Sequence, residues 1–484
     1  MLKGPNIVFI VLDTARAHNF SCYGYGKRTT PNIDRIANEG ILFENAISSS
    51  PWTLPSHASI FTGLCPSDHG CHERHKFLDT GIYTLPQYLK ENGYKTIAIS
   101  NNSWISKSFG FDKGFDEFIN LWQLVQCDTD LAAPSAKGAD KYMNAAKLFL
   151  RGDPITNIIN GIYGKFFWRR YDYGARRINR LLKSYMGGGL KGSQPFFLFV
   201  NYLESHLIYK APEPYFGKFL PADASLQEAG TVNQDAWAYM GGLVPMGSRD
   251  REVLTALYDG ELAYLDHRIG EVYEFLKQNG LLDNTMLILT SDHGENLVEH
   301  NLMDHQYCLY DTLLKVPLII RYPEAFERAK RSDRIVQTLD LFPTIQEILK
   351  TDEWKQETQG VSLLHEESDR FAVSEYLGPQ PTMEAIFRRY PNGDFKKYDR
   401  SLFSIRTKDW KLIMASDGRD ELYAVSQDPH EIHNLLESEP DVYRELKEKA
   451  RKWKEVREGE GALREEAHMS DEIKKRLESL GYFN

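Results

Sequence analysis

Short, uninterrupted hydrophobic runs, each ended abruptly by polar residues, recur along the first two thirds of the chain. They cover residues 7–12, 96–99, 196–203, 286–289 and 316–320. Because apolar residues are continuous in these runs rather than alternating, they predict strands buried on both faces, as in a parallel sheet covered by helices. Segments with a helical spacing of apolar residues separate or follow them, at residues 30–38, 85–92, 173–183, 253–277 and 339–349. This alternation predicts an α/β fold, whose ligands bind at the carboxyl ends of the strands.

The pattern changes near residue 374. Three short segments of strand character, at 402–406, 410–414 and 421–424, predict a small antiparallel sheet, and a helix is expected over 439–456. We therefore divide the chain into a large domain (1–373), a C-terminal α+β subdomain (374–456) and a charged helical tail (457–484). Two insertions in the large domain, at about 122–194 and 211–249, are expected to shape a pocket above the strand ends.

Composition and charge narrow the class of protein. A chain of 484 residues with 42% hydrophobic and 26% charged residues is globular, which excludes collagen-like and largely disordered proteins. The net charge of −10 argues against nucleic-acid binding, which needs a basic surface. Five cysteines are too few for a disulfide framework, and no apolar run reaches the roughly 18 residues of a membrane helix. We expect a cytoplasmic protein without a membrane span, and self-association is compatible with this sequence.

Polar side chains with metal-binding chemistry follow the predicted strands. Asp13 ends the first run, and Asp292 and His293 follow the run at 286–289. Because the carboxyl ends of parallel strands meet at one edge of a sheet, these groups are expected to lie close together. Two carboxylates, an imidazole and a hydroxyl form a donor set for a divalent cation.

Thr53 is the candidate for the hydroxyl. It lies at the start of a predicted helix that begins with Leu54-Pro55 and ends at Gly63. The positive field at a helix N-terminus favours an alkoxide and a bound oxyanion, and a nearby cation makes the hydroxyl a nucleophile. The alternative is that Thr53 only caps the helix, since threonine is a common N-cap.

Along nearly its whole length the chain resembles the sulfatase family of the alkaline phosphatase superfamily. The resemblance rests on residues 6–25, 30–35, 43–46, 53–63, 109–118, 258–266, 291–295, 316–320 and, near the C-terminus, 421–423, 428–431 and 434–435. It implies a large mixed, mostly parallel sheet sandwiched by helices, and a small C-terminal antiparallel sheet with a helix. It also implies a hydrolase that acts on ester bonds.

The chain departs from the sulfatase pattern at the nucleophile. Sulfatases carry Cys or Ser, any residue, Pro, a small residue and Arg, and the first of these matures to formylglycine. Here Thr53 and His57 occupy the first and last positions. Threonine has no route to formylglycine by that maturation, so no formylglycine is expected.

The other departures lie at the strand ends. Asp13-Thr14 stands where sulfatases have two aspartates, and Asp292-His293 stands where they have Asp-Asn. The family's Lys-x-His motif falls at 101–103, where both basic residues are missing. These substitutions resemble the phosphoryl-transfer relatives, such as phosphodiesterases and phosphonate monoester hydrolases, which use a Thr or Ser nucleophile with an Asp-His metal pair.

The resemblance to those relatives implies a set of site residues. One divalent ion (Mn²⁺, Zn²⁺, Mg²⁺ or Ca²⁺) is held by Asp13, Thr53, Asp292 and His293. Thr53 attacks in line, His57 binds the oxyanion or polarises the nucleophile, and His206 protonates the leaving group. The expected substrate-binding residues are Asn101, His305 and Lys315. A second ion held by Glu204, His206 and His305 is the alternative to a single ion.

These residues predict a metal-dependent hydrolase of phosphate or phosphonate esters, diesters in particular. Its partner is a small anionic ester. The alternatives are a sulfuric ester hydrolase, a transferase that passes a phospho-headgroup to a sugar or lipid, and a binding protein without activity.

Overall fold

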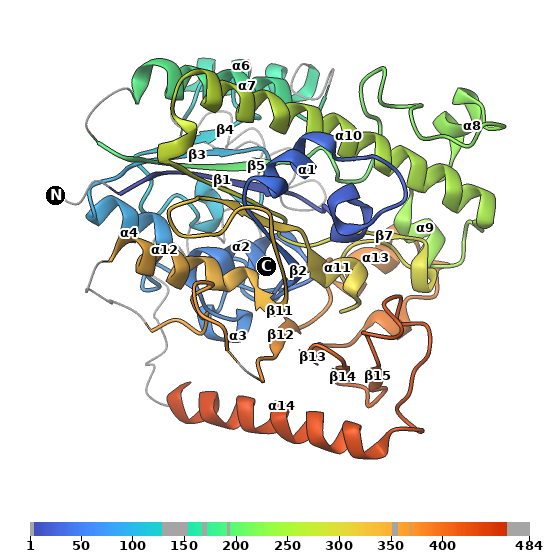
Figure 1. Cartoon of the computed structure of the whole chain (residues 1–484). Coiled ribbons are helices and arrows are strands. Elements are labelled where there is room, and N and C mark those ends of the chain that lie inside the picture. Colours follow the sequence, from blue (N-terminus) through green and yellow to red (C-terminus); the bar gives the residue numbers. More distant parts are fainter. Residues whose placement is uncertain are drawn as a thin grey trace.

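A nine-stranded sheet forms the centre of the molecule (Figure 1). The computed structural model describes residues 4–127, 153–166, 172–190, 194–350, 357–367 and 369–461. The strands are β1 (Asn6–Leu12), β2 (Ile41–Ile47), β3 (Lys95–Ser100), β4 (Glu117–Asn120), β5 (Phe196–Tyr202), β6 (Thr285–Thr290), β9 (Lys315–Val316), β10 (Leu318–Arg321) and β11 (Lys330–Gln337). Their order is β11-β2-β10-β6-β1-β5-β3-β4, with β9 paired to β2.

The sheet is mostly parallel, as predicted. β1 pairs in parallel with both β5 and β6, and β3 pairs in parallel with β4 and β5. The prediction for residues 316–320 was wrong in one respect, because that run is broken at Pro317 into β9 and β10, and both run antiparallel to their neighbours. Proline has no N–H to donate to a ladder. A strand buried on both faces is apolar whatever its direction, so its composition did not show the reversal.

Helices cover both faces of the sheet (Figure 1). One face carries α1 (Pro31–Asn38), α7 (Ala175–Ser184) and α10 (Ser248–Gln278), whose apolar residues pack with Val8 and Ile10 of β1. The other face carries α2 (Thr53–Thr62), α4 (Leu85–Glu91) and α12 (Leu341–Leu349), which pack with Ile7, Phe9 and Val11. Alternate residues of β1 thus belong to two separate cores, as a central strand with both faces covered requires.

The remaining helices and small sheets are short. The other α-helices are α3 (Pro66–His69), α6 (Pro154–Phe166), α8 (Leu226–Thr231), α9 (Ala236–Met240), α11 (Asp311–Leu314) and α13 (Met383–Arg389). β7 (Asn296–Leu297) and β8 (Met303–Asp304) form a hairpin. Single 3₁₀ or π turns occupy Ala17–Asn19, Ser21–Tyr23, Lys107–Phe109, Tyr185–Gly189, Leu282–Asn284, Glu299–Asn301, Thr338–Asp340 and Lys396–Tyr398. The insertions expected at 122–194 and 211–249 contain α6, α7, α8 and α9, although residues 128–152 lie outside the described part.

The predicted C-terminal antiparallel sheet is present. It consists of β12 (Ala372–Tyr376), β13 (Leu402–Arg406), β14 (Lys411–Ala415) and β15 (Glu421–Tyr423), in that order, and α14 (Pro440–Gly461) packs against it. A buried ion-pair network joins it to the large domain: Lys411 Nζ lies 2.9 Å from Asp311 Oδ1 and 2.7 Å from Glu431 Oε1. Most of the predicted charged tail lies beyond residue 461 and so outside the described residues.

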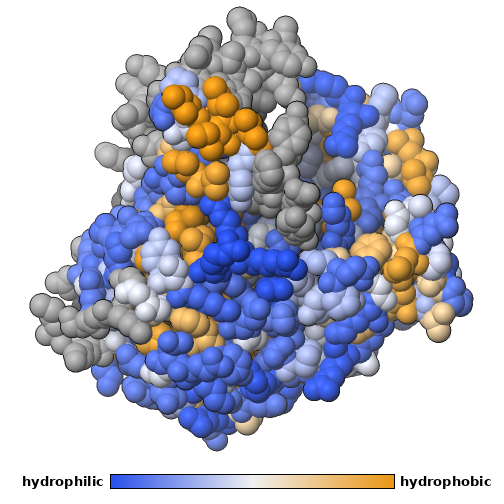
Figure 2. Space-filling model, turned by 90° about the horizontal axis from the view of Figure 1, so that it is seen from above, coloured by the Kyte–Doolittle hydropathy of each residue, from blue (hydrophilic) through white to orange (hydrophobic). Residues whose placement is uncertain are grey.

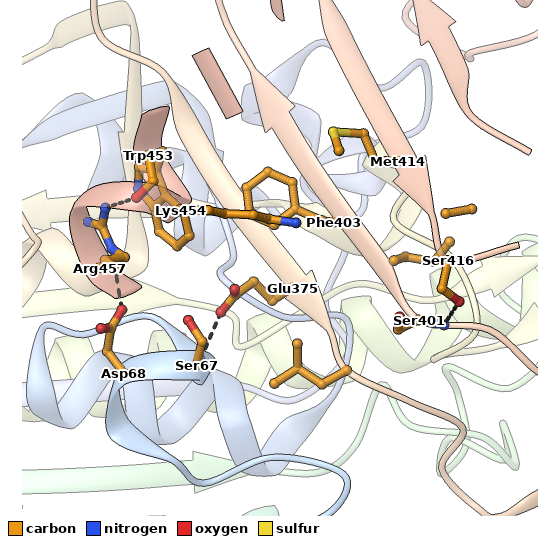
Figure 3. Close-up of a pocket in the computed structure, with 13 residues that line it drawn as sticks. Ser67, Asp68, Glu375, Ser401, Phe403, Met414, Ser416, Trp453, Lys454 and Arg457 are labelled. Carbon is orange, nitrogen blue, oxygen red and sulfur yellow. Dashed lines mark hydrogen bonds and ion pairs between the residues drawn. The ribbon is translucent and has the colours of Figure 1, made fainter. Parts of the chain in front are cut away.

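A cavity of about 640 Å³ lies between this subdomain and the large domain (Figure 3). Trp453 and Arg457 of α14 line one side of it, and Asp68 of α3 faces Arg457 at 3.4 Å. None of the strand-end residues singled out from the sequence lines this cavity. In the described residues, no helix is both long and apolar enough to cross a membrane.

Candidate active site

The carboxyl ends of β1 and β6 bring three metal-binding side chains together. Asp13 directly follows β1, and Asp292 and His293 follow β6 after one residue, Ser291. The two strands are adjacent and parallel, so their ends meet at the same edge of the sheet. Ligand atoms of Asp13, Asp292 and His293 all lie within 4.8 Å of one another, and the three side chains are fully buried.

The backbone around these residues is fixed by bonds between the two strand ends. Thr14 has a φ of 60°, in the left-handed region, and its N–H donates to Asp292 Oδ1 at 3.3 Å. The same carboxylate oxygen accepts the N–H of His293 at 2.9 Å, and Ser291 Oγ accepts the N–H of Ala15 at 3.0 Å. Asp292 is therefore held by one oxygen, which leaves the other free to point into the site.

Thr53 lies at this edge as the first residue of α2. The N-cap position is Trp52, and neither residue makes a side-chain cap bond. Thr53 Oγ1 lies 3.2 Å from His293 Nε2 and 3.5 Å from Asn102 Nδ2. The hydroxyl thus faces the metal-type residues instead of capping its helix. Gly63 ends α2 in the left-handed conformation, as expected.

The donor set fits one divalent cation. Asp13 Oδ1 and Asp292 Oδ2 are buried and have no hydrogen-bond partner, a costly arrangement for carboxylates unless a cation satisfies them. Burial also raises the pKa of Asp292. Burial lowers the pKa of His293 to about 3, so its ring is neutral. Since Nδ1 donates to Gly294 O at 2.9 Å, the Nε2 lone pair is available as a ligand.

His57 is close to these residues, one helical turn beyond Thr53. Its Nδ1 lies 2.9 Å from the carbonyl oxygen of Thr53 and 3.4 Å from Asp292 Oδ2. Its Nε2 lies 3.4 Å from Asn201 Nδ2. Asn201, which the sequence analysis missed, also reaches Asp13 Oδ2 at 3.4 Å. The feature of the sequence that could have indicated Asn201 is its polar side chain inside the hydrophobic run at 196–203.

His305 and His206 lie on the other side of His293. The rings of His293 and His305 are 4.5 Å apart, and those of His305 and His206 are 5.1 Å apart. His305 Nδ1 lies 2.7 Å from Asp304 Oδ1 and 3.4 Å from Glu295 Oε1. Burial alone lowers the pKa of His305, but these two carboxylates raise it well above its usual value. His305 is therefore an imidazolium, which can bind an anionic oxygen.

The two asparagines that follow β3 have different partners. The side chain of Asn101, which was predicted to bind substrate, donates to the carbonyl oxygen of Tyr173. Asn102 instead donates to Asp13 Oδ2 at 2.7 Å. Its amide oxygen accepts the N–H of Trp104 at 3.0 Å, which fixes the direction of the amide nitrogen. The turn after Ser100 decides which of two identical side chains faces the site, and no spacing rule predicts it.

Lys315, also predicted to bind substrate, has its hydrogen-bond partner on another strand. Its Nζ bonds to Asn45 Oδ1 at 3.1 Å, on the strand β2 next to it, and it contacts none of the residues grouped around Thr53. Burial lowers the pKa of Lys315. A lysine at the start of the two-residue strand β9 is directed by the pairing of that strand, which turns it away from the ends of β1 and β6.

The alternative set for a second ion is not assembled. Glu204 Oε1 accepts the N–H of Ala175 at 2.7 Å, at the start of α7, and Oε2 accepts the N–H of Leu203 at 3.1 Å. The backbone donors at a helix N-terminus are favourable partners for a carboxylate, and they turn Glu204 away from His206 and His305.

Glu204 gives this fold a testable pH dependence. Burial raises its pKa to about 8, above the usual value near 4.5, so the stability it supports is complete below about pH 4.5 and is lost as the pH rises through 8. In the wild type the free energy of unfolding should decline between roughly pH 5 and 8, by up to about 1.4 kcal/mol per pH unit. We expect Glu204→Gln to remove this decline. Urea unfolding of both proteins at pH 5, 6.5 and 8 measures the difference. Parallel pH profiles would contradict the prediction.

Comparison with known proteins identifies the family. A family model described as Sulfatase matches residues 5–351, well over half of the chain. The chain belongs to the sulfatase family. A second model, N-sulphoglucosamine sulphohydrolase C-terminal, matches residues 298–456. The protein is thus a sulfatase-family hydrolase that acts on esters, and the predicted alkaline phosphatase-like fold is confirmed.

The relatives of this sulfatase-family chain include sulfatases, and a phosphonate monoester hydrolase shares its fold. An uncharacterized sulfatase of Escherichia coli, YidJ, is 28% identical, and the match covers 90% of this chain and 84% of the relative. An N-acetylglucosamine-6-O-sulfatase of Bacteroides thetaiotaomicron is 26% identical, with 90% and 83% covered. The phosphonate monoester hydrolase of Agrobacterium radiobacter shares the fold with a TM-score of 0.69 and 21% identity, over 94% of this chain and 96% of that one. The structure of BT4656 with its substrate D-glucosamine-2-N,6-O-disulfate matches with a TM-score of 0.69 and 22% identity, over 94% and 98%.

Proposed function

We propose that this enzyme hydrolyses phosphate or phosphonate esters, diesters in particular, with Thr53 as the nucleophile. The observation that carries the proposal is the position of Thr53 Oγ1, 3.2 Å from His293 Nε2 at the first residue of α2. The hydroxyl faces a group of buried carboxylates whose outer oxygens lack partners. A threonine cannot provide the hydrated aldehyde of formylglycine, so the hydroxyl itself must attack.

One divalent cation, Mn²⁺, Zn²⁺, Mg²⁺ or Ca²⁺, belongs to this proposal. Asp13, Asp292, His293 and the Thr53 hydroxyl would hold it, since their ligand atoms converge and the donors are oxygen and neutral imidazole nitrogen. When bound, it supplies positive charge that lowers the pKa of the hydroxyl and stabilises the charge of the attacked ester.

In the proposed reaction Thr53 Oγ1 attacks phosphorus in line with the leaving oxygen. The hydroxyl gives its proton to solvent water, a phosphorus–Oγ1 bond forms, and the bond to the leaving oxygen breaks. The imidazolium of His305, held by Asp304 and Glu295, binds a non-bridging oxygen, and His206 beside it protonates the leaving oxygen. Water then attacks the phosphorus and gives a proton to His206, the phosphorus–Oγ1 bond breaks, and Oγ1 takes a proton from solvent, which regenerates the hydroxyl.

The neighbouring polar residues position the reacting groups. Asn102 contacts both Asp13 and Thr53, which supports a role in holding the hydroxyl against the carboxylate. His57 lies against Asp292 and is bonded to Asn201, so we assign it to orienting the ligand carboxylate. This assignment differs from the oxyanion-binding role that the sequence suggested for His57, and its ring is fully buried.

A second candidate function is hydrolysis of sulfate esters by the same hydroxyl. The curated relatives include a sulfatase named for 6-O-sulfated N-acetylglucosamine, and this favours it. The favoured substrates of the two candidates have the same charge, since a sulfate monoester and a phosphate diester each carry one negative charge, whereas a phosphate monoester carries up to two. Charge therefore does not distinguish sulfate monoesters from phosphate diesters. The two candidates must be distinguished by measuring the turnover of each substrate.

A substrate panel tests the proposal. The purified protein is loaded with each of the four cations in turn and assayed on an aryl phosphodiester, an aryl phosphonate monoester, an aryl phosphomonoester and an aryl sulfate. We expect the highest kcat/KM on the diester or the phosphonate. A higher kcat/KM on the sulfate would overturn the proposal in favour of the second candidate. Transfer to added glycerol in place of water would favour a transferase.

A further inference from the structure

The helix α6 (Pro154–Phe166) has its polarity reversed relative to an ordinary surface helix. Asn157 and Asn160, one turn apart, are 1% and 4% exposed. The opposite face carries four isoleucines at the helical spacing i, i+3, i+4 and i+7, which places them in one stripe. These residues are Ile155 (70% exposed), Ile158 (52%), Ile159 (39%) and Ile162 (51%). An orange patch lies over this part of the molecule in the view from above (Figure 2).

Specific contacts hold the helix in this orientation. Asn160 Oδ1 accepts the N–H groups of Leu124 and Val125 at 2.8 and 3.0 Å, and its Nδ2 donates to Val125 O at 2.8 Å. Arg177 of α7 donates to Tyr163 OH at 2.7 Å, and α6 and α7 lie at the top of the molecule (Figure 1). The asparagines are therefore used for anchoring, and the isoleucine stripe faces outward because of it.

The sequence around the stripe is basic, although the protein as a whole is acidic. Within the described residues 153–166 and 172–183 there are five Lys or Arg and two Asp, in a chain whose net charge is −10. On α7, next to α6, Arg176 and Arg180 are exposed one turn apart, and Lys183 continues the row. An exposed apolar stripe with exposed basic residues on the neighbouring helix is the pattern of a surface that binds an anionic bilayer.

We propose that the α6–α7 surface, defined by the isoleucine stripe and this row of basic residues, binds the surface of an anionic lipid bilayer. The isoleucines enter the boundary between headgroups and acyl chains, and the arginines contact lipid phosphates. A second copy of the chain fits less well, because a two-fold interface would set the basic segment against itself.

This surface is connected by a hydrogen bond to the loop that carries His206. Tyr173, just before α7, donates its hydroxyl to Ile208 O at 2.5 Å, and its own carbonyl accepts the side chain of Asn101. Ile208 is 54% exposed and follows His206 by two residues. A bilayer that binds α6 and α7 therefore lies near the loop of His206. The inference goes beyond the proposed hydrolase activity and does not depend on it.

Vesicle sedimentation with the full-length protein tests the proposal. Vesicles of phosphatidylglycerol and phosphatidylcholine are compared with vesicles of phosphatidylcholine alone. We expect binding to the anionic vesicles that weakens about tenfold or more in Ile158→Asn/Ile162→Asn and in Arg176→Gln/Arg180→Gln. The control Ile432→Asn removes an equally exposed isoleucine (65%) from the C-terminal subdomain and should bind as the wild type does.

Further measurements separate this proposal from others. All surface variants should hydrolyse soluble esters at the wild-type rate, and Thr53→Ala should bind vesicles normally even if it is inactive. No binding to anionic vesicles, equal binding to neutral ones, or equal loss in Ile432→Asn overturns the proposal. Light scattering that shows a dimer lost in the isoleucine variant would assign the stripe to a second copy and also overturn it.

Discussion

Thr53→Ala is expected to lower turnover of the best ester substrate by roughly 10⁴-fold, because removing a covalent nucleophile leaves only binding and electrostatic catalysis. The fold should change little, since the hydroxyl makes no cap bond and Thr53 is the first residue of its helix. The rates are measured with purified, cation-loaded protein under saturating substrate. KM should change less than kcat, since the hydroxyl acts mainly in the transition state.

Thr53→Ser is the matched control. It keeps the hydroxyl and loses only a methyl group, so a measurable share of the activity should remain, with the phosphate or phosphonate preference of the wild type. Intact-mass analysis of protein quenched during turnover should detect a phosphoryl or phosphonyl adduct in the wild type and in Thr53→Ser. Retention of more than a tenth of the activity in Thr53→Ala would refute the proposed nucleophile.

Asp292→Asn is expected to abolish cation binding. As a result, turnover of the best ester substrate should fall by about 10³-fold. The substitution keeps the shape of the side chain but removes one of two carboxylates whose outer oxygens lack partners. In wild-type protein, a cation at a hundred times its Kd should stabilise the fold by about 2.7 kcal/mol, and a chelator should reverse this. In Asp292→Asn neither cation nor chelator should shift the melting temperature.

The metal content gives the second readout. Elemental analysis should find about one ion per wild-type chain and almost none in Asp292→Asn. Without a cation the variant should be at least as stable as the wild type, because burial raises the pKa of Asp292 and disfavours its charge. Asp304→Asn is the control, since this carboxylate bonds to His305 and lies outside the proposed ligand set. Loss of the ion in that control would contradict a single site at Asp13, Asp292 and His293.

Local hydrophobic patterns located the central strands and the residues that follow them. The hydrophobic runs at 7–12 and 286–289 became β1 and β6, extended by one residue at one or both ends. The two strands are neighbours, so the residues after them meet, and Asp13, Asp292 and His293 were found in this way. Strands with interrupted patterns, such as β2 with Glu44 and Asn45 in its middle, were not predicted.

The sequence by itself determined the α/β class, the family and the residues that directly follow buried strands, because a strand buried on both faces leaves a continuous apolar signal. The tertiary structure alone decided which side chains face one another. It directs Asn102 toward Asp13, pairs Glu204 with the N-terminus of α7, and places His305 beside two carboxylates. It also turned the isoleucines of α6 outward. Each of these contacts depends either on the direction that a side chain takes after a turn or on a partner distant in sequence. The local spacing of residues along the chain contains no information on these two factors.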